Sequence, residues 1–241
     1  MSLPCALLIT CEHATNAVPA ELTPLFAGKA ALLHSHRGWD AGALELARAW
    51  AARWHAPLLA AEVSRLVCDA NRAPHNPAVW SECTRTLAPA RRAALLARWH
   101  SPHRTAVADA VRRLNAAGLP VLHLAAHSFT PVLNGVTRSM DIGLLYAPRR
   151  PQEALLARRW QAALRPMLPA VRRNAPYRGA ADGLPTFLRR LFPAECYCGF
   201  EVECNQRLLE HGPFPAAVLG DTLEEALRHA PIFLPAAATT P

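Results

Sequence analysis

Two short apolar runs each end in a histidine, and this pattern constrains the fold more than any other feature. Residues 6–11 precede Glu12 and His13, and residues 121–126 precede His127. Runs of this kind predict strands that are buried on both faces of a sheet. The carboxyl ends of neighbouring strands in an open α/β sheet open onto one crevice, where both histidines can meet. Because imidazole binds zinc well, the pair predicts a metal site there.

The order of the remaining segments predicts an α/β fold. With 241 residues and no charged or Gly/Ser-rich linker, the chain is expected to form a single domain over residues 1–235, with a disordered tail at 236–241. We expect a mostly parallel or mixed central sheet with helices on both faces. Strands are predicted at 5–11, 57–68, 119–126, 141–146 and 198–204, and helices at 40–54, 89–118 with a break or kink at Pro102, 151–168 and 222–229. The first helix is expected to bury Leu44, Ala47, Ala51 and Trp54.

The basic character of the chain does not by itself indicate a nucleic-acid partner. The net charge is +8, but the 26 basic residues are scattered along the chain, and Lys29 is the single lysine. We interpret them as a solvated surface that also suits a small anionic substrate. The seven irregularly spaced cysteines predict reduced, mostly buried thiols. No nucleic-acid motif, signal peptide or membrane span is recognised, so we expect a cytoplasmic protein without nucleic-acid or membrane partners.

A hydrolytic zinc ion needs about three protein ligands and one open position, so a carboxylate should complete the site. Asp40 is the favoured candidate, although an aspartate just before a helix can equally serve as its N-cap. Glu12 is the alternative. Neighbouring side chains on a strand point to opposite sides, which argues against Glu12 and His13 binding one ion directly. The expected ligands are therefore His13, Asp40 and His127, with Glu12 left open in place of Asp40.

Two glutamates on one face of the strand at 198–204 are candidates for a general base. Metal-assisted amide hydrolysis uses a carboxylate that takes a proton from water and returns it to the leaving nitrogen. Glu203 can do this from a strand end, and Glu201 is the alternative. The competing structural interpretation is a surface-facing strand with two solvated carboxylates.

Four further polar residues are candidates for contacts with a substrate. Guanidinium groups match carboxylates as planar forks, which makes Arg65, Arg72 and Arg138 candidates, together with Asn71 beside Arg72. An arginine close to the metal could also stabilise the oxyanion that develops during amide cleavage, and Arg65 or Arg138 could take this role.

These residues lie in blocks that resemble the N-formylglutamate amidohydrolase family, which is itself similar in plan to zinc carboxypeptidases and the aspartoacylase group. The resemblance covers roughly residues 6–215. The blocks, in chain order, are CEHATNAVP at 11–19, WDAG at 39–42, SRLVCDANR at 64–72, HSFTP at 127–131, GVTR at 135–138, NAPY at 174–177 and GFEVECNQ at 199–206.

The resemblance implies roles for the matching positions. His13 and His127 would bind one zinc ion. Asn71 and Arg72 would hold a substrate carboxylate, and Glu203 would be the base. It also implies a carboxypeptidase-like fold.

Two more positions and two departures follow from the same comparison. Ser128, beside the second histidine, and Tyr177, in the NAPY block, are expected at the substrate site. Asn16 stands where a carboxypeptidase-type motif has a glutamate ligand. Asn205 stands where the family often has an arginine, which could change the substrate.

The expected activity is zinc-dependent hydrolysis of the formyl, or a similar acyl, amide of an acidic amino acid. The archetype is the conversion of N-formyl-L-glutamate and water to formate and L-glutamate, so the expected partner is a small anionic N-acyl amino acid. A second hypothesis keeps the metal but takes another N-acyl amino acid or a peptide. A third is a non-catalytic basic binding module.

Overall fold

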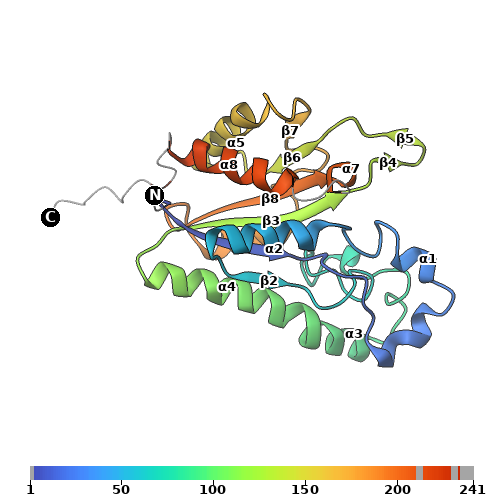
Figure 1. Cartoon of the computed structure of the whole chain (residues 1–241). Coiled ribbons are helices and arrows are strands. Elements are labelled where there is room, and N and C mark those ends of the chain that lie inside the picture. The colour runs from blue at the N-terminus through green and yellow to red at the C-terminus, as the bar shows by residue number, and fades with distance from the viewer. Residues whose placement is uncertain (1–2, 210–213, 229–232, 234–241) are drawn as a thin grey trace.

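The framework of the protein is a six-stranded sheet, seen in a computed structural model that describes residues 3–209, 214–228 and 233 (Figure 1). Its strands are β1 (Ala6–Cys11), β2 (Leu58–Ala60), β3 (Val121–Phe129), β6 (Ile142–Leu145), β7 (Val171–Arg173) and β8 (Tyr197–Asn205). They are ordered β2-β1-β3-β8-β6-β7. Every neighbouring pair is parallel except β6 and β8, which are antiparallel. The sheet is therefore mixed, as the sequence predicts.

Helices cover both faces of this sheet (Figure 1). The helical segments are η1 (Ala20–Phe26), α1 (Ala30–Leu33), α2 (Ala43–Trp54), η2 (Pro77–Val79), α3 (Pro89–Leu95), η3 (Leu96–His100), α4 (Ser101–Ala116), α5 (Pro151–Leu164), α6 (Leu184–Leu191), α7 (Gln206–Leu209) and α8 (Phe214–Arg228). On one face α2, α5 and α8 bury Trp50 and Trp160 against the sheet. On the other face α4 and α6 pack Val107 and Leu188 against Leu8. The prediction of a single α/β domain with helices on both faces is confirmed.

The central strands explain the apolar runs of the sequence. All nine residues of β3 are buried, because β1 and β8 flank the strand and helices cover both of its faces. Its register with β8 sets His127 opposite Glu203 at the carboxyl end. Two histidine-bearing strands and a glutamate-bearing strand thus end side by side.

A third apolar cluster lies outside the sheet and builds the walls of the site. It joins residues from η1, from the loops around residues 63–83 and from α3, including Leu22, Val67 and Leu95. The segment predicted as a strand at 57–68 is a strand only over β2, and the rest of it belongs to this wall. Being an edge strand with a neighbour on one side only, β2 has few partners to extend it.

Several predicted boundaries and faces differ from the structure. The helix predicted at 40–54 begins at Ala43 and buries Ala43, Leu46, Ala47 and Trp50; Leu44, Ala51 and Trp54 are only partly buried. The buried face is centred on Trp50, which packs in the core with residues of α8 and whose indole donates a hydrogen bond to the Ala216 carbonyl.

The other predicted helices are present in the structure, but they begin or end at different residues. The segment 89–118 is helical from Pro89 to Ala116 without a break, and the π-helical turn η3 lies just before Pro102, where the sequence predicts a break or kink. The helix predicted to run to Leu168 ends at Leu164, and the helix predicted from Thr222 already begins at Phe214. The predicted tail at 236–241 lies outside the described residues.

Two composition-based expectations can also be compared with the fold. All seven cysteines are free, and all except the partly buried Cys196 are buried, as predicted. Among the described helices, none combines the length and apolar character that crossing a membrane would require.

Candidate active site

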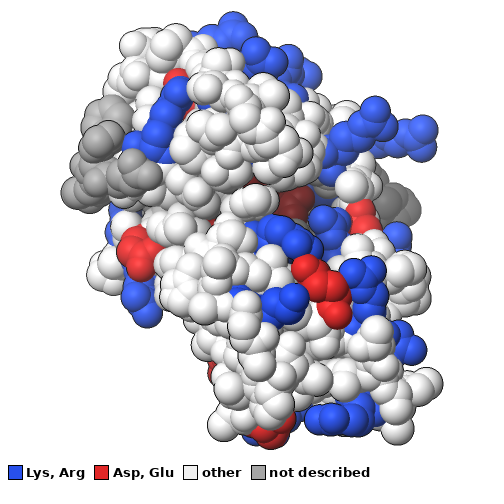
Figure 2. Space-filling model, turned by 90° about the vertical axis from the view of Figure 1, so that its right-hand side faces the viewer, with Lys and Arg blue, Asp and Glu red and all other residues white. Residues whose placement is uncertain are grey.

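A cavity of about 710 Å³ opens at the carboxyl ends of β1, β3 and β8. Figure 2 views this side of the molecule, where basic side chains surround a hollow with acidic side chains inside it. All ten residues expected at the site from the sequence line this one cavity: His13, Asp40, Arg65, Asn71, Arg72, His127, Ser128, Arg138, Tyr177 and Glu203.

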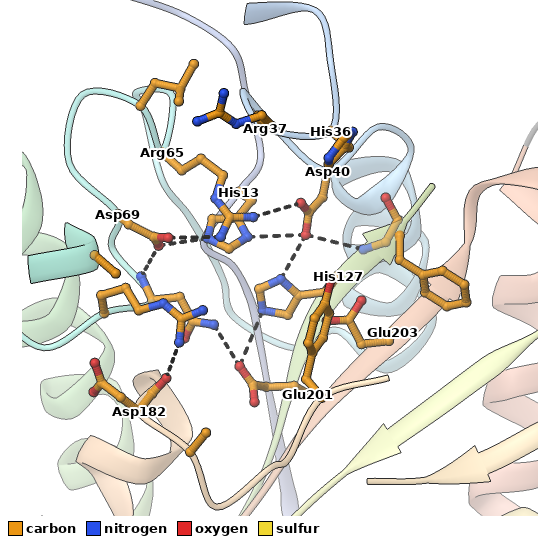
Figure 3. Close-up of a pocket in the computed structure, with 18 of the residues that line it drawn as sticks. His13, His36, Arg37, Asp40, Arg65, Asp69, His127, Asp182, Glu201 and Glu203 are labelled. Atoms are coloured by element: carbon orange, nitrogen blue, oxygen red, sulfur yellow. Dashed lines mark hydrogen bonds and ion pairs between the residues drawn. The ribbon is translucent and has the colours of Figure 1, made fainter. Parts of the chain in front are cut away.

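His13, Asp40 and His127 meet at the floor of this cavity (Figure 3). One donor atom from each residue lies within 4.8 Å of the others, and all three side chains are buried. Asp40 Oδ2 lies 3.2 Å from His13 Nδ1 and 3.0 Å from His127 Nδ1. The backbone helps to place the aspartate, since its N–H donates to the His13 carbonyl.

Asp40 is not the side-chain cap of the following helix. The N-cap of α2 is Gly42, whose φ of 78° lies in the left-handed region, and no side chain caps this end. The competing N-cap interpretation is therefore wrong, and the reason is tertiary. The two imidazoles and the Ser128 N–H, at 3.4 Å, take the carboxylate oxygen that could otherwise bond to the helix.

Each imidazole turns its other nitrogen toward a second carboxylate. His13 Nε2 lies 2.8 Å from Asp69 Oδ1, and His127 Nε2 lies 2.9 Å from Glu12 Oε2. Carboxylates in this position fix the tautomer and orientation of metal-binding histidines. Glu12 thus stands behind His127, at the ring nitrogen that does not face Asp40, and it lies in the turn that follows β1.

Buried charges of opposite sign determine the ionisation of this cluster. Burial by itself raises the pKa of Asp40, but the charge of His13 and the hydrogen bond from His127 hold it well below its ordinary value. Burial likewise opposes the ionised form of Asp69, yet Arg65 and His13 lower its pKa. The pKa of Glu12 is lowered against burial by His103 and His127.

The two histidines shift in the opposite direction. Burial lowers the pKa of His127, but hydrogen bonds to Asp40 and Glu12 raise it well above its ordinary value. Burial and Arg65 lower the pKa of His13, while Asp69 and Asp40 produce a net rise. The surrounding carboxylates therefore favour a positive charge at the point where the two imidazole rings lie close together.

Glu203 differs from Glu201 in that its buried carboxylate accepts no hydrogen bond from the described residues. Its Oε2 is buried without a hydrogen-bond partner among the described residues. Burial raises the pKa of Glu203 to about 7, with the charge of His127 opposing this shift and Asp40 adding to it. Glu201 Oε1, in contrast, accepts a 2.7 Å hydrogen bond from Asn71 Nδ2. The interpretation of a solvated surface strand is wrong, because β8 lies between β3 and β6 within the sheet.

Asn71 and Arg72 lie beside each other but face different partners. The Asn71 amide donates to Glu201 and accepts from the Leu184 N–H at 2.7 Å, so it joins β8 to the start of α6. Arg72 donates one bond, of 2.7 Å, to the Asp182 carbonyl. It has no carboxylate within ion-pair distance among the described residues, which leaves the rest of its guanidinium for a ligand.

The remaining candidates divide into supporting and open side chains. Arg65 contacts Asp69 at 3.0 Å and Asp40 at 3.5 Å. The Ser128 hydroxyl donates to the Ala41 carbonyl at 2.7 Å, which holds the segment beside Asp40. By contrast, half of the Tyr177 surface is exposed.

Arg138 is held near the opening by its backbone and by an aromatic ring. Its guanidinium lies over the Phe129 ring, 5.5 Å from the ring centre. Asn205, the departure noted in the sequence, is fully buried and donates to the carbonyls of Arg138 and Met140 at 3.3 and 2.8 Å. It therefore supports the segment that carries Arg138 and does not line the cavity itself.

Three residues with evident roles were not singled out by the sequence. Asp69, behind His13, lies in the SRLVCDANR block, which carries the family resemblance without assigning this residue a role. Asp182 accepts hydrogen bonds from the Ala73 N–H and from Asn76, which places it under the loop that carries Arg72. His103 of α4 approaches Glu12, with Nε2 4.0 Å from Oε1. Their roles depend on contacts between distant segments, for which no local pattern exists.

The fold and the buried histidine–carboxylate site place the protein among hydrolases built on a mixed α/β sheet. More specifically, the chain belongs to the N-formylglutamate amidohydrolase family, whose model matches residues 5–210.

Two solved structures are similar to this chain. A gene product from Agrobacterium tumefaciens is 30% identical, with a TM-score of 0.81 over 94% of this chain and 92% of that one. The N-formylglutamate amidohydrolase from Ralstonia eutropha is 20% identical, with a TM-score of 0.65 over 96% and 94% of the two chains, which shows a shared fold. A search of curated proteins found no significant match.

Proposed function

We propose that the protein is a zinc-dependent amidohydrolase that cleaves the formyl, or a similar acyl, amide of an acidic amino acid. The convergence of His13, Asp40 and His127 in the cavity that also contains Glu203 carries this proposal. Membership of the family supports amide hydrolysis, with N-formyl-L-glutamate as the archetypal substrate.

The charges of the cluster fit a divalent cation. Glu12, Asp40 and Asp69 contribute three negative charges, and Arg65 contributes one positive charge through its contacts with two of them. A divalent ion would balance the two charges that remain. The donors are two imidazole nitrogens and a carboxylate oxygen, a set that zinc accepts while keeping a position for substrate.

In this proposal the protein's own side chains carry most of the reaction. His13, Asp40 and His127 would hold the ion, which when bound supplies positive charge beside the reacting carbonyl. Glu203 would take the proton from the attacking water and return it to the leaving nitrogen. Burial raises the pKa of the Glu203 carboxyl, which makes it a stronger base than an exposed glutamate.

Two arginines would act on the substrate. One would orient the anionic substrate, and the other would stabilise the negative charge that develops on it. Arg72 would hold a substrate carboxylate with the N–H groups that its bond to Asp182 leaves available. Arg138 would stabilise the developing oxyanion. Since Arg65 already contacts two carboxylates, we assign to it the positioning of Asp40 and Asp69.

The experiment is a metal-dependence test with a panel of N-formyl and N-acetyl amino acids. We expect chelation to abolish hydrolysis of N-formyl-L-glutamate and zinc to restore it. His127→Ala should lose both bound zinc and activity, whereas His75→Ala, at an exposed histidine outside the cavity, should keep both. Full activity after chelation, or in the His127→Ala variant, would refute the metal assignment.

A further inference from the structure

The cavity is larger than an N-formyl amino acid requires. Its volume is about 710 Å³, and pockets of roughly 300–1,000 Å³ accommodate drug-sized ligands. The groups used in the proposed reaction lie on its floor and on the Arg72 and Arg138 sides. The rest of the lining is therefore available to a longer substrate.

Two loops on the rim each contribute an arginine and an aromatic side chain to the lining of the cavity. Arg85 and Trp80 follow η2, and Arg178 and Tyr177 precede α6. Neither arginine lies within ion-pair distance of a carboxylate in the described parts of the chain, and both are exposed. Arg37 on the same rim differs, because it contacts Glu82 at 2.8 Å.

The rim is therefore mostly basic, with Arg37, Arg85 and Arg178 near the acidic Glu82, whereas carboxylates line the floor. On the floor, Asp40 and Asp69 already pair with the two histidines and with Arg65, and they lie outside ion-pair distance of Arg85 and Arg178. Arginines of this kind favour carboxylates, which they bind with two parallel N–H groups. Because Arg85 and Arg178 lie on two separate loops, an anionic group that extends from the reacting amide would contact one of these arginines.

We infer that the cavity selects N-acylated acidic amino acids that bear a third carboxylate, held at the rim by Arg85 or Arg178. The inference rests on the proposed function, because the reacting amide and the carboxylate that Arg72 holds are those of the proposed acyl amino acid substrate. The additional carboxylate could lie on the amine side of the amide, as in an N-formyl acidic dipeptide, or at the end of the acyl chain. In both cases the substrate carries one additional negative charge, at a position that Arg72 does not reach.

Ligand binding to the Glu203→Gln variant is measured by calorimetry at low salt. Matched ligand pairs separate the effect of ligand charge on affinity from the effect of ligand size. N-formyl-Glu-Glu is compared with N-formyl-Glu-Gln for the amine side, and N-glutaryl-Glu with N-pentanoyl-Glu for the acyl side. Each pair differs in one charge at nearly equal size. We expect the charged member of at least one pair to bind about threefold tighter or more, the range for exposed ion pairs.

Variants at the rim test whether the arginines cause the preference. Arg85→Gln combined with Arg178→Gln, in the same Glu203→Gln background, should bring the affinity ratio close to one. Arg113→Gln, at an exposed arginine outside the cavity, should leave the ratio unchanged. Equal affinities in both pairs, or a preference that survives the double substitution, would overturn the inference.

The two proposals can fail separately. If charge-selective binding is found but the wild-type protein hydrolyses none of these compounds, the rim assignment stands and the amidohydrolase assignment fails. If N-formyl-L-glutamate is hydrolysed but neither pair shows a charge preference, the amidohydrolase assignment stands and the third-carboxylate site fails.

Discussion

Replacing Glu203 with glutamine should remove catalysis and, in the metal-free protein, increase stability at alkaline pH. A buried catalytic carboxylate must be ionised for the reaction, and its buried charge destabilises the folded protein. Removing that charge should therefore lower activity and raise stability. A residue with a purely structural role would show a loss of stability instead. The side chain is buried, and its Oε2 has no partner among the described residues.

The magnitude follows from the shift in pKa. Burial raises the pKa of Glu203 from 4.5 to about 7 in the folded protein, and each unit corresponds to about 1.4 kcal/mol, so the ionised carboxylate costs on the order of 3 kcal/mol. The folded state binds this proton more tightly than the unfolded state. The free energy of unfolding therefore falls as the pH rises from 4.5 through 7, and the full cost is present above pH 7.

Glutamine carries no charge, so this pH-dependent loss should be absent from the variant. Urea denaturation of chelator-treated wild type and Glu203→Gln would be followed by circular dichroism at pH 5 and pH 8.5. The variant should gain stability relative to wild type at the higher pH, with about 3 kcal/mol as the upper limit. Zinc-loaded Glu203→Gln should lose about 10²-fold or more in turnover.

Glu201→Gln is the matched control. Its carboxylate already accepts a hydrogen bond from Asn71, so the same substitution two residues away should give a smaller gain or a loss. A Glu203→Gln variant that is less stable than wild type at pH 8.5, or that keeps full activity, would contradict the reasoning.

Three other perturbations test separate parts of the structure. Glu12→Gln removes the carboxylate 2.9 Å from His127 Nε2 and should weaken zinc binding about 10–100-fold in a chelator competition assay; unchanged affinity would disprove the role of Glu12. Asn71→Ala leaves the Leu184 N–H and the Glu201 carboxylate without their partner and should cost about 1–3 kcal/mol in urea denaturation. Trp160→Ala should cost about 3–5 kcal/mol by the same measurement, because this fully buried side chain also donates hydrogen bonds to α8; a change below 1 kcal/mol would contradict its place in the core.

Much of the framework can be predicted from local patterns. Apolar runs identify β1 and β3, because a strand between two others, covered on both faces, must be apolar along its length, whereas β8 is identified by the alternation of its side chains. The position of His13, His127 and Glu203 near strand ends then predicts that they meet, since parallel strands deliver their carboxyl ends to one edge. The boundaries of helices and of β2 are less accurate, because packing decides where an element ends.

The direction of individual side chains cannot be read in the same way. Asp40 could cap a helix or join the histidines with equal local justification, and only the two imidazoles that lie next to it decide between these roles. Asn71 beside Arg72 suggests a pair that holds substrate, yet the Asn71 amide is taken by β8 and α6. Asp69 becomes important only because β1 places His13 within 2.8 Å of it.

The sequence by itself determined the α/β class, the edge of the sheet at which the site forms and the residue types that meet there, because these depend on periodicity and on strand direction. Only the tertiary structure decided which carboxylate lies between the two imidazoles, which ones stand behind them and which arginines are left without partners. The reason is that hydrogen bonds and ion pairs between buried groups depend on distances of a few ångströms between segments far apart in the chain. These distances are set by packing, and no local sequence pattern encodes them.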